Sequence, residues 1–270
     1  MKITVFTSNQ LRHINLINLI SEFAEQTFAV LESNTLFPEL ASDSAYSSPT
    51  MQEYMLRVRK AEQNFFGESR LISTRVNSLV MKSGDLNYLT QEHLKESLQS
   101  DIYIVFGSSF IKGWLIDFLI EKKALNIHMG LSPYYRGSSC NFWAMYDDLP
   151  NYVGATIHYL SKGLDSGPII FHSVPQYNNE DPFFFTMKAV KKAQEDLVYF
   201  IKNINNLNYI PVNQDKGLLV RYTRGSDFTE KVAREFLDRK LSYQDLERMI
   251  KKSRKPEMIG FNLISVGRFL

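Results

Sequence analysis

The opening of the chain most constrains its fold. Lys2 to Thr7 is a short run of β-branched, aromatic and apolar residues, which indicates a strand. Ser8 or Asn9 can cap the helix that follows, in which apolar residues recur near helical spacing from Leu11 to Phe23. Phe28 to Leu31 has the pattern of a second buried strand. A β-α-β opening predicts a parallel sheet with helices packed on its faces.

The same alternation continues along the chain and predicts the α/β class. Further strands are expected at residues 101–106, 124–128, 152–160, 168–174 and 217–222. Helices are expected at residues 51–66, 91–99, 110–121, 139–146, 181–204 and 231–252. Residues 34–80 have a weaker pattern and are expected to form an insertion over the sheet. We predict one catalytic domain over residues 1–204 and a small C-terminal extension over residues 205–270.

Composition excludes several classes of protein. A chain of 270 residues with 44% hydrophobic and 22% charged residues is long enough to bury a sizeable core. A net charge of +2 without a long basic tract argues against a nucleic-acid partner. Cys140 is the single cysteine, so no intramolecular disulfide forms and a reducing cytoplasm is expected. No run reaches the roughly 20 apolar residues of a membrane span.

Two short stretches contain the residue types that acyl transfer needs. Leu125 to Gly137 includes Asn126 and His128, which lie on the same face if this segment is a strand. Asp165 lies in the glycine-flanked turn from Gly163 to Gly167. An amide can stabilise an oxyanion, an imidazole can transfer a proton, and a carboxylate can orient the imidazole. Taken singly, each also has an ordinary structural explanation; their joint presence favours a catalytic site.

The loops after two predicted strands suggest where this site lies. Gly107 to Phe110 follows one strand, and His128 to Gly137 follows the next. In open α/β sheets, ligands bind in the crevice at the carboxyl ends of the strands. If these two strands are neighbours, their loops form one crevice.

For several other side chains the sequence allows either a binding role or a structural role. Arg136 either reaches an anionic substrate or bridges its loop to a surface carboxylate. Tyr134 and Tyr135 either stack on a ring or pack in the interior. His158 and His172 lie in predicted strands, and a structural role is favoured for both. No metal site is expected, because the usual zinc-ligand spacings are absent.

These motifs together resemble the catalytic core of folate-dependent formyltransferases. The resemblance rests on N-I-H at Asn126, the S-P-Y-Y-R-G loop and G-L-D-S-G at Gly163, and it is strongest over residues 101–175. It implies a Rossmann-like formyltransferase core, 10-formyltetrahydrofolate as donor, and Asn126, His128 and Asp165 as the catalytic residues. In this scheme Asn126 stabilises the oxygen of the tetrahedral intermediate, while His128 and Asp165 move the proton of the attacking amine.

The resemblance also implies binding residues. The donor is expected on backbone groups of two loops: Ser108, Ser109, Phe110 and Ile111, and Gly163 and Leu164. Candidates for acceptor binding come from three parts of the chain: Ser8, Asn9 and Arg12 after the first strand, Ser132, Tyr134, Tyr135 and Arg136 in the S-P-Y-Y-R-G loop, and Tyr222 near the C-terminus.

Departures from known family members narrow the acceptor. The residues after the first strand lack the glycine-rich phosphate loop of the glycinamide ribonucleotide enzymes, although Ser8, Asn9 and Arg12 can still reach a phosphate. The region after Ile204 is smaller than the C-terminal barrel of the tRNA enzymes. The loop with S-P-Y-Y-R-G is most similar to enzymes of surface polysaccharides such as lipopolysaccharide. An amino-sugar nucleotide is therefore the expected acceptor.

Alternatives remain at this point. The acceptor can be glycinamide ribonucleotide or methionyl-tRNA, or the chain can be a folate-binding or nucleotide-sugar-binding protein without turnover. A folate-independent amide-forming or hydrolytic enzyme is a third possibility. The apolar positions of the C-terminal region suit either a homodimer seam or a core: Phe236, Leu241, Leu246 and Ile250.

Overall fold

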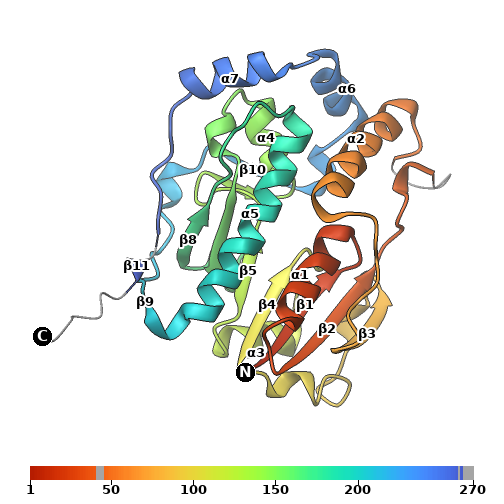
Figure 1. Cartoon of the computed structure of the whole chain (residues 1–270), viewed down its shortest axis with the longest axis vertical. Coiled ribbons are helices and arrows are strands. Elements are labelled where there is room, and N and C mark those ends of the chain that lie inside the picture. Colours follow the sequence, from red (N-terminus) through yellow and green to blue (C-terminus); the bar gives the residue numbers. More distant parts are fainter. Residues whose placement is uncertain (41–45, 261, 264–270) are drawn as a thin grey trace, which may run out of the picture.

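A seven-stranded sheet forms the centre of the protein in the computed structural model, which describes residues 1–40, 46–260 and 262–263 (Figure 1). The strand order is β3-β2-β1-β4-β5-β7-β8. Its strands are β1 (Lys2–Ser8), β2 (Gln26–Ser33), β3 (Val76–Lys82), β4 (Ile102–Phe106), β5 (Leu125–His128), β7 (Ala155–Tyr159) and β8 (Ile169–Ser173). The strands from β3 to β5 pair in parallel, and β7 and β8 add antiparallel pairs at one edge.

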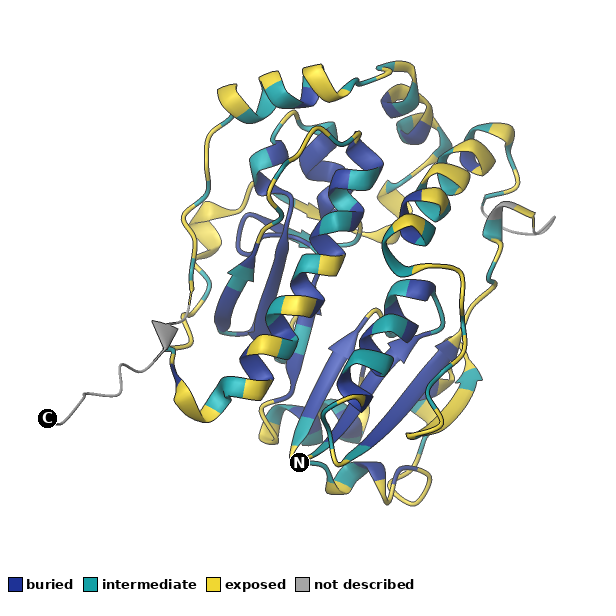
Figure 2. Ribbon diagram, viewed as in Figure 1, coloured by how far each residue is buried: buried dark blue, intermediate teal, exposed yellow. Residues whose placement is uncertain are grey.

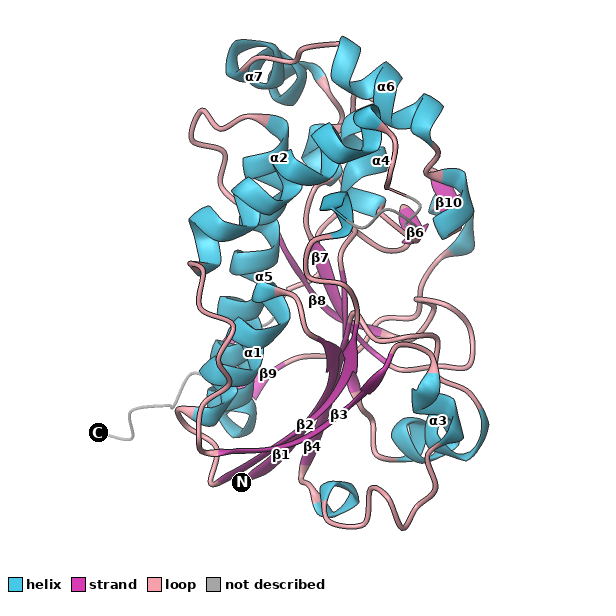
Figure 3. Ribbon diagram, turned by 90° about the vertical axis from the view of Figure 1, so that its right-hand side faces the viewer, coloured by secondary structure: helices cyan, strands magenta, loops and turns pink. Residues whose placement is uncertain are grey.

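Helices cover both faces of this sheet. The α-helices of the described residues are α1 (Leu11–Ser21), α2 (Pro49–Phe66), α3 (Gly113–Glu121), α4 (Cys140–Tyr146), α5 (Pro182–Asn203), α6 (Glu230–Asp238) and α7 (Tyr243–Lys252). Figure 3 views the sheet nearly edge-on, with α1 and α5 on one side and α3 on the other. The arrangement is the three-layer, mainly parallel α/β fold that the sequence predicts.

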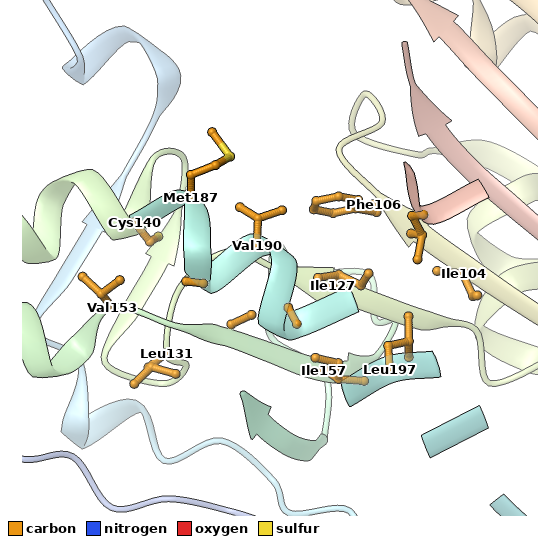
Figure 4. Packing of buried hydrophobic residues seen from close by; sticks show 14 of the residues in the cluster. Ile104, Phe106, Ile127, Leu131, Cys140, Val153, Ile157, Met187, Val190 and Leu197 are labelled. Atoms are coloured by element: carbon orange, nitrogen blue, oxygen red, sulfur yellow. The ribbon is translucent and has the colours of Figure 1, made fainter. Parts of the chain in front are cut away.

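Alternation along the strands builds a separate hydrophobic core on each face. In β4, Ile104 and Phe106 belong to the core cluster that includes residues of α1 and α5, whereas Tyr103 and Val105 belong to the cluster that includes residues of α3. Successive strand residues point to opposite faces, so a strand buried on both sides is apolar throughout. Figure 2 shows this burial of the central strands, and Figure 4 shows Ile104 and Phe106 near residues of α5.

The expected elements are largely confirmed, with four exceptions. The strand predicted over residues 217–222 is a 3-10 turn at Lys216–Leu218 followed by a strand only at Arg221–Thr223, and the helix predicted over residues 231–252 is divided into Glu230–Asp238 and Tyr243–Lys252. The other two exceptions are residues 91–99 and an unpredicted edge strand. The β-α-β opening, the strands around β4 and β5, and the long helix α5 lie close to their predicted bounds. The helix predicted over residues 91–99 is wrong: the segment forms turns and a 3-10 turn at Ser97–Gln99. Strand β3 was missed because it is a largely exposed edge strand, and its sequence lacks the apolar pattern of a buried one.

The C-terminal region packs against the rest of the chain through short strands. Strand β10 (Arg221–Thr223) pairs in parallel with β6 (Tyr135–Gly137), and β11 (Asn262–Leu263) pairs with β9 (Leu207–Asn208). Of the four apolar positions with two interpretations, Phe236 and Leu246 are buried in the main core, and Leu241 and Ile250 pack against it. The core interpretation therefore describes them, and a homodimer stays a prediction.

His172 ties the C-terminal segment to β8. Its Nε2 lies 2.7 Å from the carbonyl oxygen of Ser132, and its Nδ1 accepts a hydrogen bond from the Ile259 N–H at 3.1 Å. Burial lowers the pKa of His172 from 6.5 to about 4, although the Ser132 carbonyl opposes this shift. The folded protein therefore holds this ring neutral at a pH where the unfolded chain protonates it.

We expect His172 to make the fold sensitive to acid between pH 6.5 and about 4. In this window the unfolded chain binds the extra proton, so stability falls as the pH falls, by about 3 kcal/mol in total for this group. His172→Gln should lessen this loss of stability in urea unfolding across the window. His93→Gln, at an exposed position, is the matched control and should not; equal slopes in all three proteins would contradict the prediction.

No helix among the described residues is long and apolar enough to cross a membrane.

Candidate active site

Strand β5 places the predicted amide and imidazole on one face of the sheet. Leu125 and Ile127 point into the core that includes α1 and α5. Asn126 and His128 alternate with them and therefore point to the opposite face. There they line a cavity of about 490 Å³ at the carboxyl ends of β4 and β5.

The turn between β7 and β8 brings Asp165 to this face. Asp165 adopts a left-handed conformation with φ of 45°, which Asp tolerates better than most residues. Gln214 Nε2 donates to the carbonyl oxygens of Asp165 and Gly167, both at 2.9 Å, and so restrains the backbone of the turn. A Cβ at Gly167 would lie 1.8 Å from the carbonyl oxygen of Tyr159, so this position admits only glycine.

Gly167→Ala should destabilise the protein by about 1–3 kcal/mol or more, because the new methyl group meets rigid strand backbone. Gly225→Ala is the matched control, since its Cβ would meet only Ser138 Oγ at 3.9 Å, and we expect a change within about 0.5 kcal/mol. Urea denaturation of both variants measures the difference. A Gly167→Ala protein as stable as the control would show that the turn is less constrained than the structure indicates.

The three predicted catalytic side chains meet in the cavity. His128 Nδ1 lies 3.3 Å from Asp165 Oδ2, and Asn126 Nδ2 donates to Asp165 Oδ1 at 3.4 Å. The N–H of Gly137 donates to Asp165 Oδ2 at 3.3 Å. The acidic turn therefore lies beside both residues of β5, within direct hydrogen-bonding reach.

His158 joins this group, although a structural role was favoured for it. Its Nε2 lies 2.9 Å from Asn126 Nδ2 and 3.9 Å from Asp165 Oδ1, while its Nδ1 lies 2.7 Å from the carbonyl oxygen of Tyr159. A proton on Nδ1 satisfies that carbonyl and leaves Nε2 to accept from the amide of Asn126. The antiparallel register of β5 and β7, which pairs Asn126 with His158, causes this contact. That register is a tertiary feature without a clear sequence signal.

The surroundings of His128 set its protonation state. Nδ1 faces Asp165, and Nε2 lies 3.0 Å from the carbonyl oxygen of Tyr135. Both partners are acceptors, so the ring donates to both only when it is protonated. Burial nevertheless lowers the pKa of His128 below 6.5, against the opposing effects of Asp165 and the Tyr135 carbonyl. At neutral pH the ring is neutral, and Asp165 is placed to stabilise the charge that a transferred proton brings.

Arg221 of the C-terminal region is connected, through Asp147, to Tyr135, whose carbonyl oxygen faces His128. The Tyr135 hydroxyl donates to Asp147 Oδ2 at 3.0 Å, and Arg221 of β10 binds the two oxygens of Asp147 at 2.8 and 2.6 Å. The Arg221 guanidinium also lies 4.6 Å from the ring centre of Trp143. Pairing of β10 with β6 therefore helps to position His128 through the backbone of Tyr135.

The predicted donor-binding residues line the same cavity. These are Ser108, Ser109, Phe110, Ile111, Gly163 and Leu164. The buried Glu32, at the end of β2, anchors their first loop: it accepts from the N–H of Ser109 at 2.5 Å and from the N–H of Gly84 at 2.7 Å. The N–H of Ser109 thus already donates to Glu32, so the formyl donor would have to contact other atoms of this residue.

Ser8 and Arg12 line an adjoining cavity, and these two residues and Asn9 have partners within the chain. Ser8 Oγ accepts from Asn34 Nδ2 at 3.0 Å, and Asn9 Nδ2 donates to the carbonyl oxygen of Asn34 at 2.9 Å. Arg12 Nη1 donates to Glu62 Oε1 at 2.7 Å. Phosphate contact by Ser8, Asn9 and Arg12 stays an untested prediction, and at Arg12 a phosphate would have to compete with the carboxylate of Glu62.

The S-P-Y-Y-R-G loop contributes mainly to the interior. Ser132, Tyr134 and Tyr135 are at most 4% exposed, so the packing interpretation describes the two tyrosines. Arg136 Nη2 donates to the carbonyl oxygen of Leu164 at 2.7 Å, a partner that neither earlier interpretation named. Tyr222 is 47% exposed, and its ring centre lies 6.0 Å from the Arg136 guanidinium. Of these candidates, only Arg136 touches the turn that contains Asp165.

The described residues contain no group of three or more His, Cys, Asp or Glu side chains that could hold a metal ion.

Sequence comparison places this cavity in a known context. Residues 84–199 match the profile of the formyl transferase family. Mitochondrial formyltetrahydrofolate deformylase 1 of Arabidopsis thaliana is 30% identical over 116 residues, which are 43% of this chain and 34% of that protein. A methionyl-tRNA formyltransferase of Caldicellulosiruptor saccharolyticus is 33% identical over 92 residues, 34% of this chain and 29% of that protein. The chain thus spans about a third of the length of these curated relatives.

Solved structures share the fold over most of the chain. A 4-N formyltransferase from Francisella tularensis superposes with a TM-score of 0.53 and 21% identity, covering 84% of this chain and 77% of that one. Phosphoribosylglycinamide formyltransferase from Anaplasma phagocytophilum gives a TM-score of 0.52 and 18% identity, covering 83% of this chain and 98% of that one. At these identities the likeness concerns the fold.

Proposed function

We propose that this chain, which carries a formyl transferase segment at residues 84–199, transfers a formyl group from 10-formyltetrahydrofolate to the amine of an amino-sugar nucleotide. The observation that supports this most is the meeting of Asn126, His128 and Asp165 in one cavity, with contacts of 3.3 and 3.4 Å to the carboxylate. The product class would serve surface-polysaccharide synthesis.

The cavity suits a reduced folate as donor. Ile111, Ile116 and Leu160 give it apolar surface for a flat ring system, and Gly163 and Leu164 of the turn also line it. A volume of about 490 Å³ is in the range of small-molecule sites. When bound there, 10-formyltetrahydrofolate supplies the formyl carbon.

The side chains then have separate tasks. Asn126 would turn an amide N–H, now shared between His158 and Asp165, toward the formyl oxygen and stabilise the charge that develops on it. Neutral His128 would take the proton that the attacking amine loses and pass it to the departing folate nitrogen. Ionised Asp165 would stabilise the imidazolium in between. The C–N bond between the acceptor amine and the formyl carbon forms, and the C–N bond between that carbon and the folate nitrogen breaks. The proton moves from the amine nitrogen to the folate nitrogen.

Two observations favour a sugar amine as acceptor. The segment after β1 contains no glycine, and a glycine-poor loop does not let a phosphate approach the backbone closely. The fold is also shared with a protein described as a sugar N-formyltransferase, from Shewanella. The 30% sequence identity with a formyltetrahydrofolate deformylase over 116 residues supports a second candidate function, in which water replaces the amine.

One assay separates these functions. Purified protein is given 10-formyltetrahydrofolate with amino-sugar nucleotides, glycinamide ribonucleotide, methionyl-tRNA or water alone, and products are identified by mass spectrometry. We expect a formamido sugar nucleotide as the main product. Formate release at the same rate with and without amines would support the deformylase candidate. Failure to bind any reduced folate would refute both.

A further inference from the structure

A second cavity adjoins the catalytic one. It has a volume of about 560 Å³, lies at the carboxyl ends of β1 and β2, and adjoins the catalytic cavity at Phe106, Gly107 and Met129, which line both. We call it the acceptor chamber. Strands β2 and β4 flank β1 on opposite sides, so the chamber lies where the strand order reverses, the usual ligand position in open α/β sheets.

Helix α1 begins at this chamber, and a carboxylate of the chain occupies its N-terminus. Glu62, from α2, is 3% exposed. Its Oε1 accepts from the backbone N–H of Arg12 at 3.1 Å and from Arg12 Nη1 at 2.7 Å. Gln10, the residue before α1, makes no side-chain capping bond. Glu62 therefore supplies the negative charge that a helix N-terminus favours.

A phosphate would need the same contacts. In α/β proteins the first amides of such a helix commonly bind phosphate, and a nearby arginine pairs with it. Both donors are already used by Glu62. A phosphate entering here would have to displace or lie beside a buried carboxylate, and repulsion between two anions in a poorly hydrated site opposes this.

His13 contributes a buried polar ring to the wall of the chamber. His13 lines the chamber and is 4% exposed, and its Nδ1 has no hydrogen-bond partner within the described part of the chain. Burial, with a contribution from Arg12, keeps the pKa of His13 well below 6.5, so the ring is neutral. A neutral imidazole exchanges hydrogen bonds with hydroxyl groups and gives no charge attraction for an anion.

We infer that Glu62 is a specificity-determining residue: its carboxylate takes the anion position at the N-terminus of α1, so that the acceptor chamber receives an uncharged, hydroxyl-bearing group and excludes a phosphate. For the acceptor this rests on the proposed function, in which the sugar enters the chamber and the nucleotide phosphates stay outside. The occupied anion position itself is independent of any reaction.

Removal of the carboxylate tests the inference without turnover. Glu62→Ala leaves the guanidinium and the backbone N–H of Arg12 without their anion and opens space beside them. We expect its melting temperature to fall relative to wild type, and inorganic phosphate to raise it again by at least about 2 °C in a saturable way. Sodium chloride at equal ionic strength should not do so, and wild-type protein should not respond to phosphate.

The control is Glu53→Ala on the same helix, which removes an exposed carboxylate paired with Arg57 at 2.6 Å and should show no phosphate response. If Glu62→Ala is unfolded in plain buffer, recovery of far-UV circular dichroism in phosphate but not in chloride is the readout. Saturable stabilisation of wild type by phosphate, for example through Arg59 at the chamber wall, would overturn the inference. So would an absence of rescue in Glu62→Ala. Neither result bears on whether formyl transfer occurs.

Discussion

His128→Asn is expected to lower kcat/KM for formyl transfer by about 10²–10⁴-fold, because it removes the imidazole that lies 3.3 Å from Asp165 Oδ2 in the cavity and that accepts the proton of the amine. Asparagine cannot take up a proton, so the amine would lose its proton to water instead. Steady-state rates with 10-formyltetrahydrofolate and the best acceptor of the panel measure the loss. Reduced-folate binding should change little, which separates chemistry from folding.

The pH profile gives a second readout for His128. Since burial lowers its pKa below 6.5, the neutral form persists into more acidic solution than an ordinary histidine allows. In wild type, kcat/KM should therefore decline on the acidic side with a midpoint below pH 6.5. The residual activity of His128→Asn should not show this acidic decline. His93→Asn, at an exposed site, is the control, and near wild-type rates in His128→Asn would refute the assignment.

Asp165→Asn is expected to lower kcat/KM by about 10²-fold or more, because the protonated form of His128 loses the charge that stabilises it. It also removes an acceptor of the Asn126 amide and of the Gly137 N–H. Asp215→Asn, in an exposed turn where Asp215 Oδ1 accepts from the Gly217 N–H at 2.8 Å, is the matched control and should retain activity. Equal rates in both variants would show that Asp165 only shapes its turn.

Asp165 should also contribute to stability in a defined pH range. Burial alone would raise its pKa, but His128, His158 and the Gly137 N–H lower it from 3.8 to about 2. A depressed carboxyl pKa stabilises the fold above pH 3.8, by about 2 kcal/mol, and this is lost as the pH falls toward 2. The stability gap between wild type and Asp165→Asn in urea should therefore narrow across that range.

The sequence predicted the parts of the fold that depend on local pattern. The strands of the β-α-β opening and β4 follow from apolar runs that a strand buried on both sides explains. In β5 apolar and polar residues alternate, which put Asn126 and His128 on one face. The pattern did not reveal β3, which is an exposed edge, nor the irregular segment at residues 91–99.

The sequence alone thus determined which residues are the candidates for the chemistry, because side-chain type and strand periodicity are properties of neighbours along the chain. Only the tertiary structure decided what surrounds them. The antiparallel register of β7 brought His158 to Asn126, β10 fixed the backbone that faces His128, and α2 delivered Glu62 to the start of α1. These contacts join residues far apart in sequence, and their geometry depends on how whole elements pack.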